Sequence, residues 1–146
     1  MKKSIAIVMC LLALLLLCSC GTKEQSNMDT NSTNAVIFIN GVKDADIWIL
    51  ADTEANRKTT VWGTATASKV KTGESRETPL CEPGENGLYL FRMIDTDSFF
   101  YSANGISLEA GWTMQIEGED LHSITIKVID GDGKLSDTYD VFAARL

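Results

Sequence analysis

Side chains that can carry covalent chemistry are scarce in this chain of 146 residues. His122 is the only histidine, and a hydrolytic relay needs such a base in contact with a serine. Ser123 follows it, but neighbouring residues of a strand point to opposite faces, so the two side chains do not meet there. A zinc site is also excluded, because His122 and Cys81 alone make no ligand set. We therefore expect a protein that is not an enzyme.

Cys81 lies in a segment with turn chemistry, Leu80–Gly87, which also carries Glu82 and Glu85. Nearby negative charge does not activate a thiol, so we expect an inert or half-buried side chain. The alternative is a disulfide with another molecule.

Carboxylates recur in pairs along the chain and supply the hard oxygen ligands that calcium prefers. The candidate calcium ligands are Asp130 and Asp132, in Asp130-Gly131-Asp132-Gly133. This segment lacks the later glutamate and the glycine placement of an EF-hand loop, so only a generic site fits it. A hairpin turn in which the acids cap backbone amides is the favoured alternative. The sequence suggests no other cofactor.

Four aromatic residues are the candidate binding residues: Trp48, Trp62, Phe100 and Tyr101. Phe99-Phe100-Tyr101 places three rings in succession in an expected strand, and they cannot all face one surface of a sheet. Either both faces are covered or one ring is exposed. Exposed rings among acids and amides suit sugar stacking or a protein contact, whereas core packing is the default.

These side chains must be positioned by β-strands. After residue 34 the chain consists of short runs rich in Val, Ile, Thr and aromatic residues, separated by Gly, Asn or Asp. The alternation is clearest near the end, where Ile124, Ile126 and Val128 share one face and Leu135–Ala144 returns after a turn. One short helical turn is expected near Thr53. Eight or nine strands predict an all-β fold, a single antiparallel β-sandwich, with an open barrel as the alternative.

The series of turn and strand signals is similar to that of small bacterial lipoproteins and secreted proteins with immunoglobulin-like or transthyretin-like sandwiches. The signals are Asn40, Ile47-Trp48-Ile49, Trp62-Gly63, Leu108-x-x-Gly111 to Ile116, and Ile126-x-Val128-x-Asp130-x-Asp132-Gly133. The resemblance covers most of residues 35–146. It implies the fold and no chemistry.

The N-terminal sequence predicts where the protein is located. Two lysines precede an apolar run, Ile5–Leu17, that is too short to span a membrane, and Leu17-Cys18-Ser19-Cys20 follows. This pattern resembles the lipobox of bacterial lipoproteins. The resemblance implies that the Cys20 thiol receives a diacylglyceryl group and that Cys20 becomes the first residue after cleavage. An ordinary secretory signal or an uncleaved anchor is the alternative.

We therefore expect a lipoprotein signal peptide over residues 1–19, the lipidated cysteine and a flexible tether over residues 20–34, and the β-sandwich domain over residues 35–146. Two or three acyl chains would hold the protein durably at the membrane. The expected location is the extracytoplasmic face of the cell membrane. In a bacterium with two membranes it would be the outer membrane, because Gly21 and not aspartate follows Cys20.

Net charge limits the partners. The chain has a formal charge of −7, and without Lys2 and Lys3 it keeps 11 basic and 20 acidic residues, about −9. This charge argues against nucleic acid or anionic lipid as a partner. With Cys20 lipidated, Cys81 is the one cysteine left outside the signal peptide, so no internal disulfide is expected.

These observations predict a membrane-anchored lipoprotein whose non-catalytic domain binds a protein or a glycan at the cell envelope. One alternative is an inhibitor or accessory subunit that inserts a loop such as Leu80–Leu88 into a partner enzyme. Another is a structural envelope protein whose sheet edge pairs with itself. An exposed aromatic row favours the first, a projecting ordered loop the second, and an uncovered edge strand the third.

Overall fold

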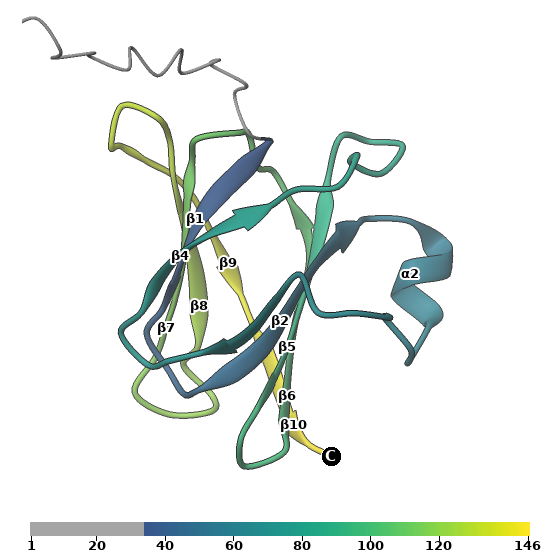
Figure 1. The fold of residues 1–146 in the computed structure, drawn as a ribbon, viewed down its shortest axis with the longest axis vertical. Helices are drawn as coiled ribbons and strands as arrows, with labels where there is room; N and C mark the ends of the chain where they lie inside the picture. Colours follow the sequence, from purple (N-terminus) through teal and green to yellow (C-terminus); the bar gives the residue numbers. More distant parts are fainter. Residues whose placement is uncertain (1–33) are drawn as a thin grey trace, which may run out of the picture. The chain divides into compact units, whose positions relative to one another are not determined.

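The computed structural model describes residues 34–146, in which ten strands and one short helix follow one another (Figure 1). Their bounds are β1 (Ala35–Asn40), β2 (Ala45–Ala51), α2 (Glu54–Lys58), β3 (Ala67–Val70), β4 (Ser75–Pro79), β5 (Tyr89–Asp95), β6 (Phe99–Ile106), β7 (Thr113–Glu117), β8 (Thr125–Ile129), β9 (Leu135–Asp140) and β10 (Phe142–Arg145). The predicted signal peptide, Cys20 and most of the predicted tether lie outside the described residues.

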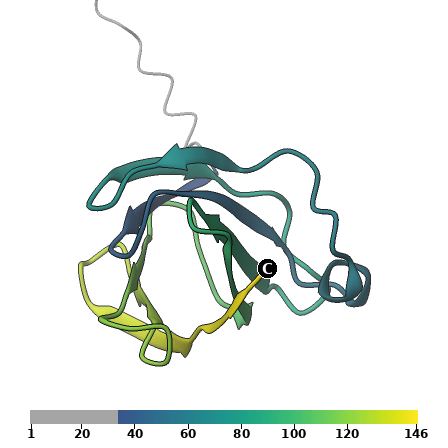
Figure 2. The same ribbon diagram turned by 90° about the horizontal axis from the view of Figure 1, so that it is seen from below.

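The strands form two five-stranded sheets. Sheet A has the order β4-β1-β7-β8-β9, and sheet B has the order β10-β6-β5-β2-β3. Neighbouring strands are antiparallel except β1 and β7, which run parallel. Figure 2 shows the strands of the two sheets around a common interior, with α2 outside it. The predicted all-β sandwich is confirmed with one parallel pair, and its immunoglobulin-like or transthyretin-like type stays a prediction.

The sheets bury alternate residues of their strands against each other, as the two-residue period of a strand requires. On β8, Ile126 and Val128 are fully buried, and Ile124 just before it is nearly so, as their alternation predicted. The rings of Phe38 in sheet A and Phe91 in sheet B stack with centroids 5.9 Å apart. This pair connects the two sheets across the core, and the described residues have a hydrophobic core of their own.

The C-terminal return differs from the sequence prediction. Leu135–Ala144 was expected as one strand after the hairpin turn, but β9 pairs with β8 in sheet A whereas β10 pairs with β6 in sheet B. The chain changes sheets at Val141, which is buried and whose backbone N–H donates to the Ile124 carbonyl oxygen at 3.0 Å. The chain end therefore ties the two sheets together and brings β10 to the edge of sheet B.

The connection from β2 to β3, residues 52–66, is here called the β2–β3 segment. It contains α2, whose N-cap Thr53 accepts a hydrogen bond on its hydroxyl from the Asn56 backbone N–H at 3.1 Å. Arg57 and Lys58 occupy the last turn, where the helix dipole favours positive charge. The helical turn predicted near Thr53 is thus confirmed. Because β3 pairs antiparallel with β2, the segment doubles back beside sheet B.

Candidate functional site

Three of the four candidate aromatic residues meet on the outer face of sheet B. Cross-strand register places Trp48 of β2 opposite Arg92 of β5, Arg92 opposite Ser102 of β6, and Ser102 opposite Phe142 of β10. The alternate residues of the same strands, such as Phe91, belong to the core. This row therefore crosses four strands on the face that points away from the core.

The β2–β3 segment adds Trp62 to this face. The Trp62 ring lies nearly parallel to the Phe100 ring, with 5.3 Å between centroids and 9° between planes. Its centroid is 5.5 Å from that of Trp48, at 60°. The indole N–H of Trp48 donates to the Gly63 carbonyl oxygen at 3.2 Å, and that of Trp62 to the Thr59 carbonyl oxygen at 3.1 Å. Because both indole N–H groups are engaged, the rings offer a ligand apolar surface.

A pocket of about 550 Å³, here called the sheet B pocket, lies beside this stack. Its volume is typical of a small-molecule site. The lining consists of three aromatic, two aliphatic, four neutral polar and three cationic residues: Trp62, Phe100, Phe142, Ile94, Leu146, Thr59, Thr60, Ser102, Asn104, Arg57, Lys58 and Arg92. No aspartate or glutamate of the described chain is part of this lining. The pocket therefore combines apolar rings with positive charge.

Arg92 is the cation nearest to the sheet in this pocket and is only 5% exposed. Its Nη1 donates to the carbonyl oxygens of Phe91 at 2.7 Å and Ala103 at 3.1 Å, and to Oδ1 of Asn104 at 2.9 Å. These three bonds hold the guanidinium in one orientation. Burial lowers the pKa of Arg92 and the Asp52 charge opposes that shift, so the side chain stays cationic.

Asp52 fixes the β2–β3 segment to the sheet at the start of α2. Its side chain is almost completely buried and receives hydrogen bonds from Arg57 Nη2 at 2.9 Å and from the Gly105 backbone N–H at 2.9 Å. The hydrogen bond from Arg57, followed by that from Gly105, holds the pKa of Asp52 below its usual range although burial acts in the opposite direction. The ionised pair therefore ties one wall of the pocket to β6.

Of the four predicted binding residues, the structure brings together Trp48, Trp62 and Phe100, but not Tyr101. Tyr101 is only 2% exposed and lies on the core face of β6, because it alternates with Phe100. Its hydroxyl donates to Oδ2 of Asp95 at 2.7 Å. Tyr101 is therefore buried on the core face and not part of the aromatic stack, although it lines a second pocket, so its role in binding stays a prediction. The three successive rings are divided between the two faces of the sheet.

Sequence reasoning missed two residues of this pocket that carry a recognisable signal. Arg92 is the one charged residue within the apolar run Tyr89–Ile94, and a charge in such a run often marks a partner across the sheet. Phe142 follows the buried Val141 and so points away from the core, where it is 65% exposed. The positions of Arg57 and Lys58 had no such signal, because they depend on where the β2–β3 segment crosses the sheet.

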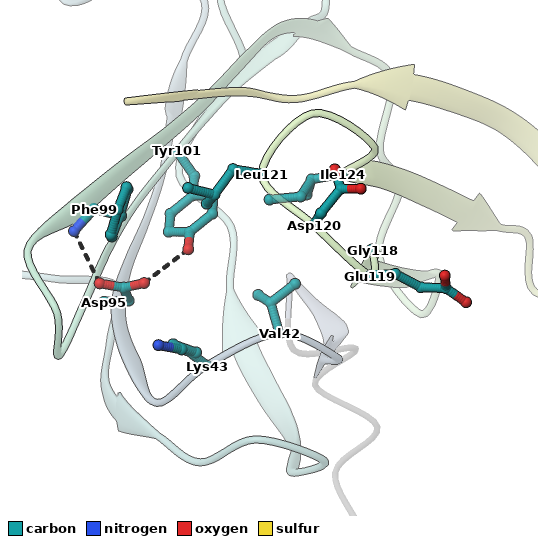
Figure 3. Close-up of a pocket in the computed structure, with 10 residues that line it drawn as sticks. All are labelled: Val42, Lys43, Asp95, Phe99, Tyr101, Gly118, Glu119, Asp120, Leu121 and Ile124. Atoms are coloured by element: carbon teal, nitrogen blue, oxygen red, sulfur yellow. Dashed lines mark hydrogen bonds between the residues drawn. The ribbon is translucent and has the colours of Figure 1, made fainter. Parts of the chain in front are cut away.

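A second pocket, of about 220 Å³, is lined by the β1–β2 and β7–β8 connections, by the end of β5 and by the start of β6 (Figure 3). Asp95 faces it and accepts hydrogen bonds from the Phe99 backbone N–H at 2.9 Å and from the Tyr101 hydroxyl, the two dashed lines in Figure 3. It also accepts from the Asp97 backbone N–H. Asp95 thus organises the β5–β6 turn.

The candidate calcium ligands lie in the β8–β9 hairpin. Oδ1 of Asp130 accepts hydrogen bonds from the backbone N–H groups of Asp132 and Lys134, each at 2.9 Å. This is the amide capping that the sequence offered as the alternative. Among residues 34–146 no group of three or more His, Cys, Asp or Glu side chains is placed to hold a metal ion. Calcium binding by Asp130 and Asp132 stays a prediction.

The remaining reactive side chains lie away from the sheet B pocket lining. Cys81 is a free thiol and is exposed, so the half-buried alternative is wrong, whereas the inertness of the thiol stays a prediction. His122 lies in the β7–β8 connection, where its backbone N–H donates to Oδ1 of Asp120. The Ser123 hydroxyl interacts with the Asp120 backbone. The hydrogen bonds of the Ser123 hydroxyl are therefore to the Asp120 backbone and not to the His122 imidazole.

Comparison of the chain with protein-family models, with curated proteins and with solved structures finds no match. In the part of the chain that the structure describes, no helix is long and apolar enough to cross a membrane.

Proposed function

We propose that this protein is a bacterial lipoprotein, anchored through lipid on Cys20 to the extracytoplasmic face of the membrane, whose β-sandwich domain binds a glycan without catalysis. The sheet B pocket is the proposed binding site. The observation that carries the proposal is that three aromatic residues, Trp62, Phe100 and Phe142, line the same pocket of about 550 Å³. Sugar rings present apolar C–H faces that pack well on aromatic rings.

The polar side chains of the pocket fit the same ligand class. Ser102 and Asn104 extend from β6, and Thr59 and Thr60 from the β2–β3 segment, so hydroxyl and amide groups converge from two sides. Specific small-molecule sites combine apolar walls with a few such groups. A glycan has both kinds of surface in one molecule. A protein surface remains the alternative occupant.

Binding would be tested with the full chain purified in a polyoxyethylene detergent, because a detergent with a sugar headgroup would compete for the site. The probes are immobilised cell-wall fragments and purified oligosaccharides. Phe142→Ala should weaken binding about three- to tenfold, the magnitude of one aromatic contact. Leu135→Ala is the matched control: Leu135 is 60% exposed on β9 and is not part of the pocket.

Two results would contradict the proposed site. If no probe binds, the glycan assignment is wrong, and the exposed Cys81–Gly87 loop becomes the surface to test against partner enzymes. If a probe binds but Phe142→Ala and Leu135→Ala behave alike, the ligand lies elsewhere on the domain.

The anchor has a separate test. Incorporation of labelled palmitate by bacteria that express the chain should be abolished by Cys20→Ala. Cys18→Ala should leave incorporation intact, because Cys18 belongs to the segment that is removed. Labelling of the Cys20→Ala variant at the parent level would contradict the proposed lipidation site.

A further inference from the structure

We propose that the glycan recognised by the sheet B pocket is acidic, and that its carboxylate or phosphate group binds Arg92. This inference rests on the proposed function, and it names the chemical class of the ligand. It depends on the charge of the pocket lining, the incomplete pairing of Arg92 and the size of the pocket.

The pocket has the opposite charge to the chain. The formal net charge is −7, yet the pocket lining contains Arg57, Lys58 and Arg92 and no acidic side chain of the described residues. A surface rich in carboxylates repels anions in general. The three cations in this lining reduce that repulsion at the pocket. Two of the three cations have acidic partners, Arg57 with Asp52 and Lys58 with Glu54, so Arg92 is the cation of the lining that an acidic ligand would meet without a competing carboxylate.

Arg92 is a charge in a largely buried position without an ionic partner of its own. None of the ion pairs among the described residues includes it. The acid that influences it is Asp52, and that carboxylate is already bound by Arg57. Buried charges are normally paired, because desolvation without a counter-charge is costly. A ligand carboxylate or phosphate would supply the missing counter-charge.

The geometry of Arg92 leaves donors for that anion. Its protein bonds are all made by Nη1, to two carbonyl oxygens and one amide oxygen. No buried side-chain nitrogen or oxygen among the described residues lacks a partner, so the Nε and Nη2 groups are not sealed from solvent. Arg92 lines the pocket. Arg92 is only 5% exposed, but a guanidinium that is held at one nitrogen and not sealed at the others can form the paired hydrogen bonds that carboxylates and phosphates accept.

Two further cations of the lining come from α2: Lys58, which can move toward a ligand, and Arg57, which is fixed. Lys58 pairs with Glu54 on the surface, and its side chain is 74% exposed. Such surface pairs are weak and rearrange at little cost. Arg57 binds Asp52 through Nε and Nη2, so Asp52 holds its guanidinium at the pocket edge.

The pocket is too large and too apolar for an inorganic ion alone. Its volume of about 550 Å³ and the rings of Trp62, Phe100 and Phe142 require a ligand with a substantial apolar surface. An acidic sugar satisfies both requirements, because its ring packs on the aromatic side chains while its carboxylate or phosphate reaches Arg92.

The test compares the affinities of matched ligands for the full chain, purified in the same polyoxyethylene detergent. Tetrasaccharides of galactose and of galacturonic acid differ in one carboxylate per ring, and galactose 6-phosphate and inorganic phosphate provide the phosphate arms. We expect galacturonate to bind at least about tenfold more tightly than galactan, because hydrogen bonds between charged groups are stronger than neutral ones. The advantage should decrease with salt, because part of it comes from exposed charges. A preference for galactose 6-phosphate over galacturonate would assign the phosphate source instead.

Three variants assign the preference to residues. Arg92→Lys keeps the charge but loses the paired donors, so it should weaken acidic binding about tenfold and reduce the preference for the acidic over the neutral tetrasaccharide. Lys58→Gln should weaken acidic binding about two- to fivefold, the range of an exposed charge. Lys134→Gln, on the β8–β9 hairpin outside the pocket, is the matched control and should have no effect. A thermal melt of each variant establishes that it is folded; if Arg92→Lys does not fold, Lys58→Gln against Lys134→Gln decides.

The outcomes separate this inference from the proposed function. Galactan and galacturonate that bind equally, with no effect of Lys58→Gln, would overturn the acidic ligand while glycan binding stands. Binding of inorganic phosphate as tight as that of any sugar would also overturn it, since the rings would then contribute nothing. No binding of any sugar would remove the proposed function itself.

Discussion

Trp62 and Phe100 lie with their rings nearly parallel, 5.3 Å between centroids and 9° between planes, although one belongs to the β2–β3 segment and the other to β6. Trp48 of β2 packs against the same indole at 60°. The segment thus depends on side-chain stacking to stay on sheet B, in addition to the ion pair of Asp52 and Arg57. The wall of the pocket and the stability of the domain are therefore coupled.

Replacement of Trp62 by alanine should detach this wall. We expect Trp62→Ala to lower the free energy of unfolding by about 1–3 kcal/mol, because a half-buried ring loses two aromatic contacts and its buried area. Urea denaturation measures the change. The matched control is Val61→Ala: Val61 is the neighbouring residue and is 79% exposed, so its replacement should change stability by less than about 0.5 kcal/mol. Equal midpoints for the two variants would show that the stack does not hold the segment.

The sequence indicated that Trp48, Trp62 and Phe100 were candidate rings, but it could not bring them together. Alternation around Phe100 establishes that it and Tyr101 face opposite ways, without saying which of the two faces the core. That choice depends on which strands pair, and the pairing of β5 with both β2 and β6 joins residues far apart in the chain. The same dependence explains why Phe142 was missed, since its place in the pocket follows from the move of the chain into sheet B at Val141.

Gly84 is needed where two backbones approach closely. A Cβ atom at this position would lie 2.2 Å from the Asp52 carbonyl oxygen and 2.9 Å from the Asp52 backbone nitrogen. Backbone atoms cannot give way as a flexible side chain does, so Gly84→Ala should cost about 1–3 kcal/mol of stability, the range of an overpacked site. Gly131→Ala is the control, because nothing lies within 4 Å of its Cβ position. If Gly84→Ala unfolds at the same urea concentration as Gly131→Ala, the close approach to Asp52 does not exist in solution.

Tyr101→Phe tests whether this side chain is buried on the core face of β6. The substitution removes the hydroxyl that donates to Asp95, leaving a buried carboxylate with its backbone donors, and should cost about 1–2 kcal/mol in urea unfolding. Burial, with the Asp95 hydrogen bond and charge adding to it, raises the pKa of the Tyr101 hydroxyl. In an alkaline absorbance titration the variant should therefore lose one tyrosine ionisation that lies above the usual range of tyrosine. A variant that instead loses an early ionisation would place Tyr101 on the surface.

Some elements of this fold could be predicted from the local sequence pattern, and others could not. The β8–β9 hairpin was predicted because alternation and turn residues act within a short range, and the short helical turn near Thr53 was predicted for the same reason. β4 had no such signal: its sequence Ser-Arg-Glu-Thr-Pro is polar, and it becomes a strand because it pairs with β1 at the edge of sheet A. The parallel pairing of β1 with β7 likewise depends on tertiary contacts and has no local signature.

Asp52 should make the stability of the domain depend on pH in the acidic range. Its pKa is lower in the folded chain than in the unfolded chain, mainly because of the hydrogen bond from Arg57. Such a group contributes stability above its unfolded pKa, and the contribution is lost as the pH falls through the folded pKa. We therefore expect Asp52→Asn to be less stable than the parent at neutral pH, with the difference shrinking as the pH falls from about 5 to about 2. Urea unfolding of both proteins across this range measures the effect. Arg57→Gln removes the partner and should show the same narrowing. A difference that stays constant over the whole range would mean that the Asp52 charge does not hold the β2–β3 segment, and that its shape and neutral hydrogen bonds suffice.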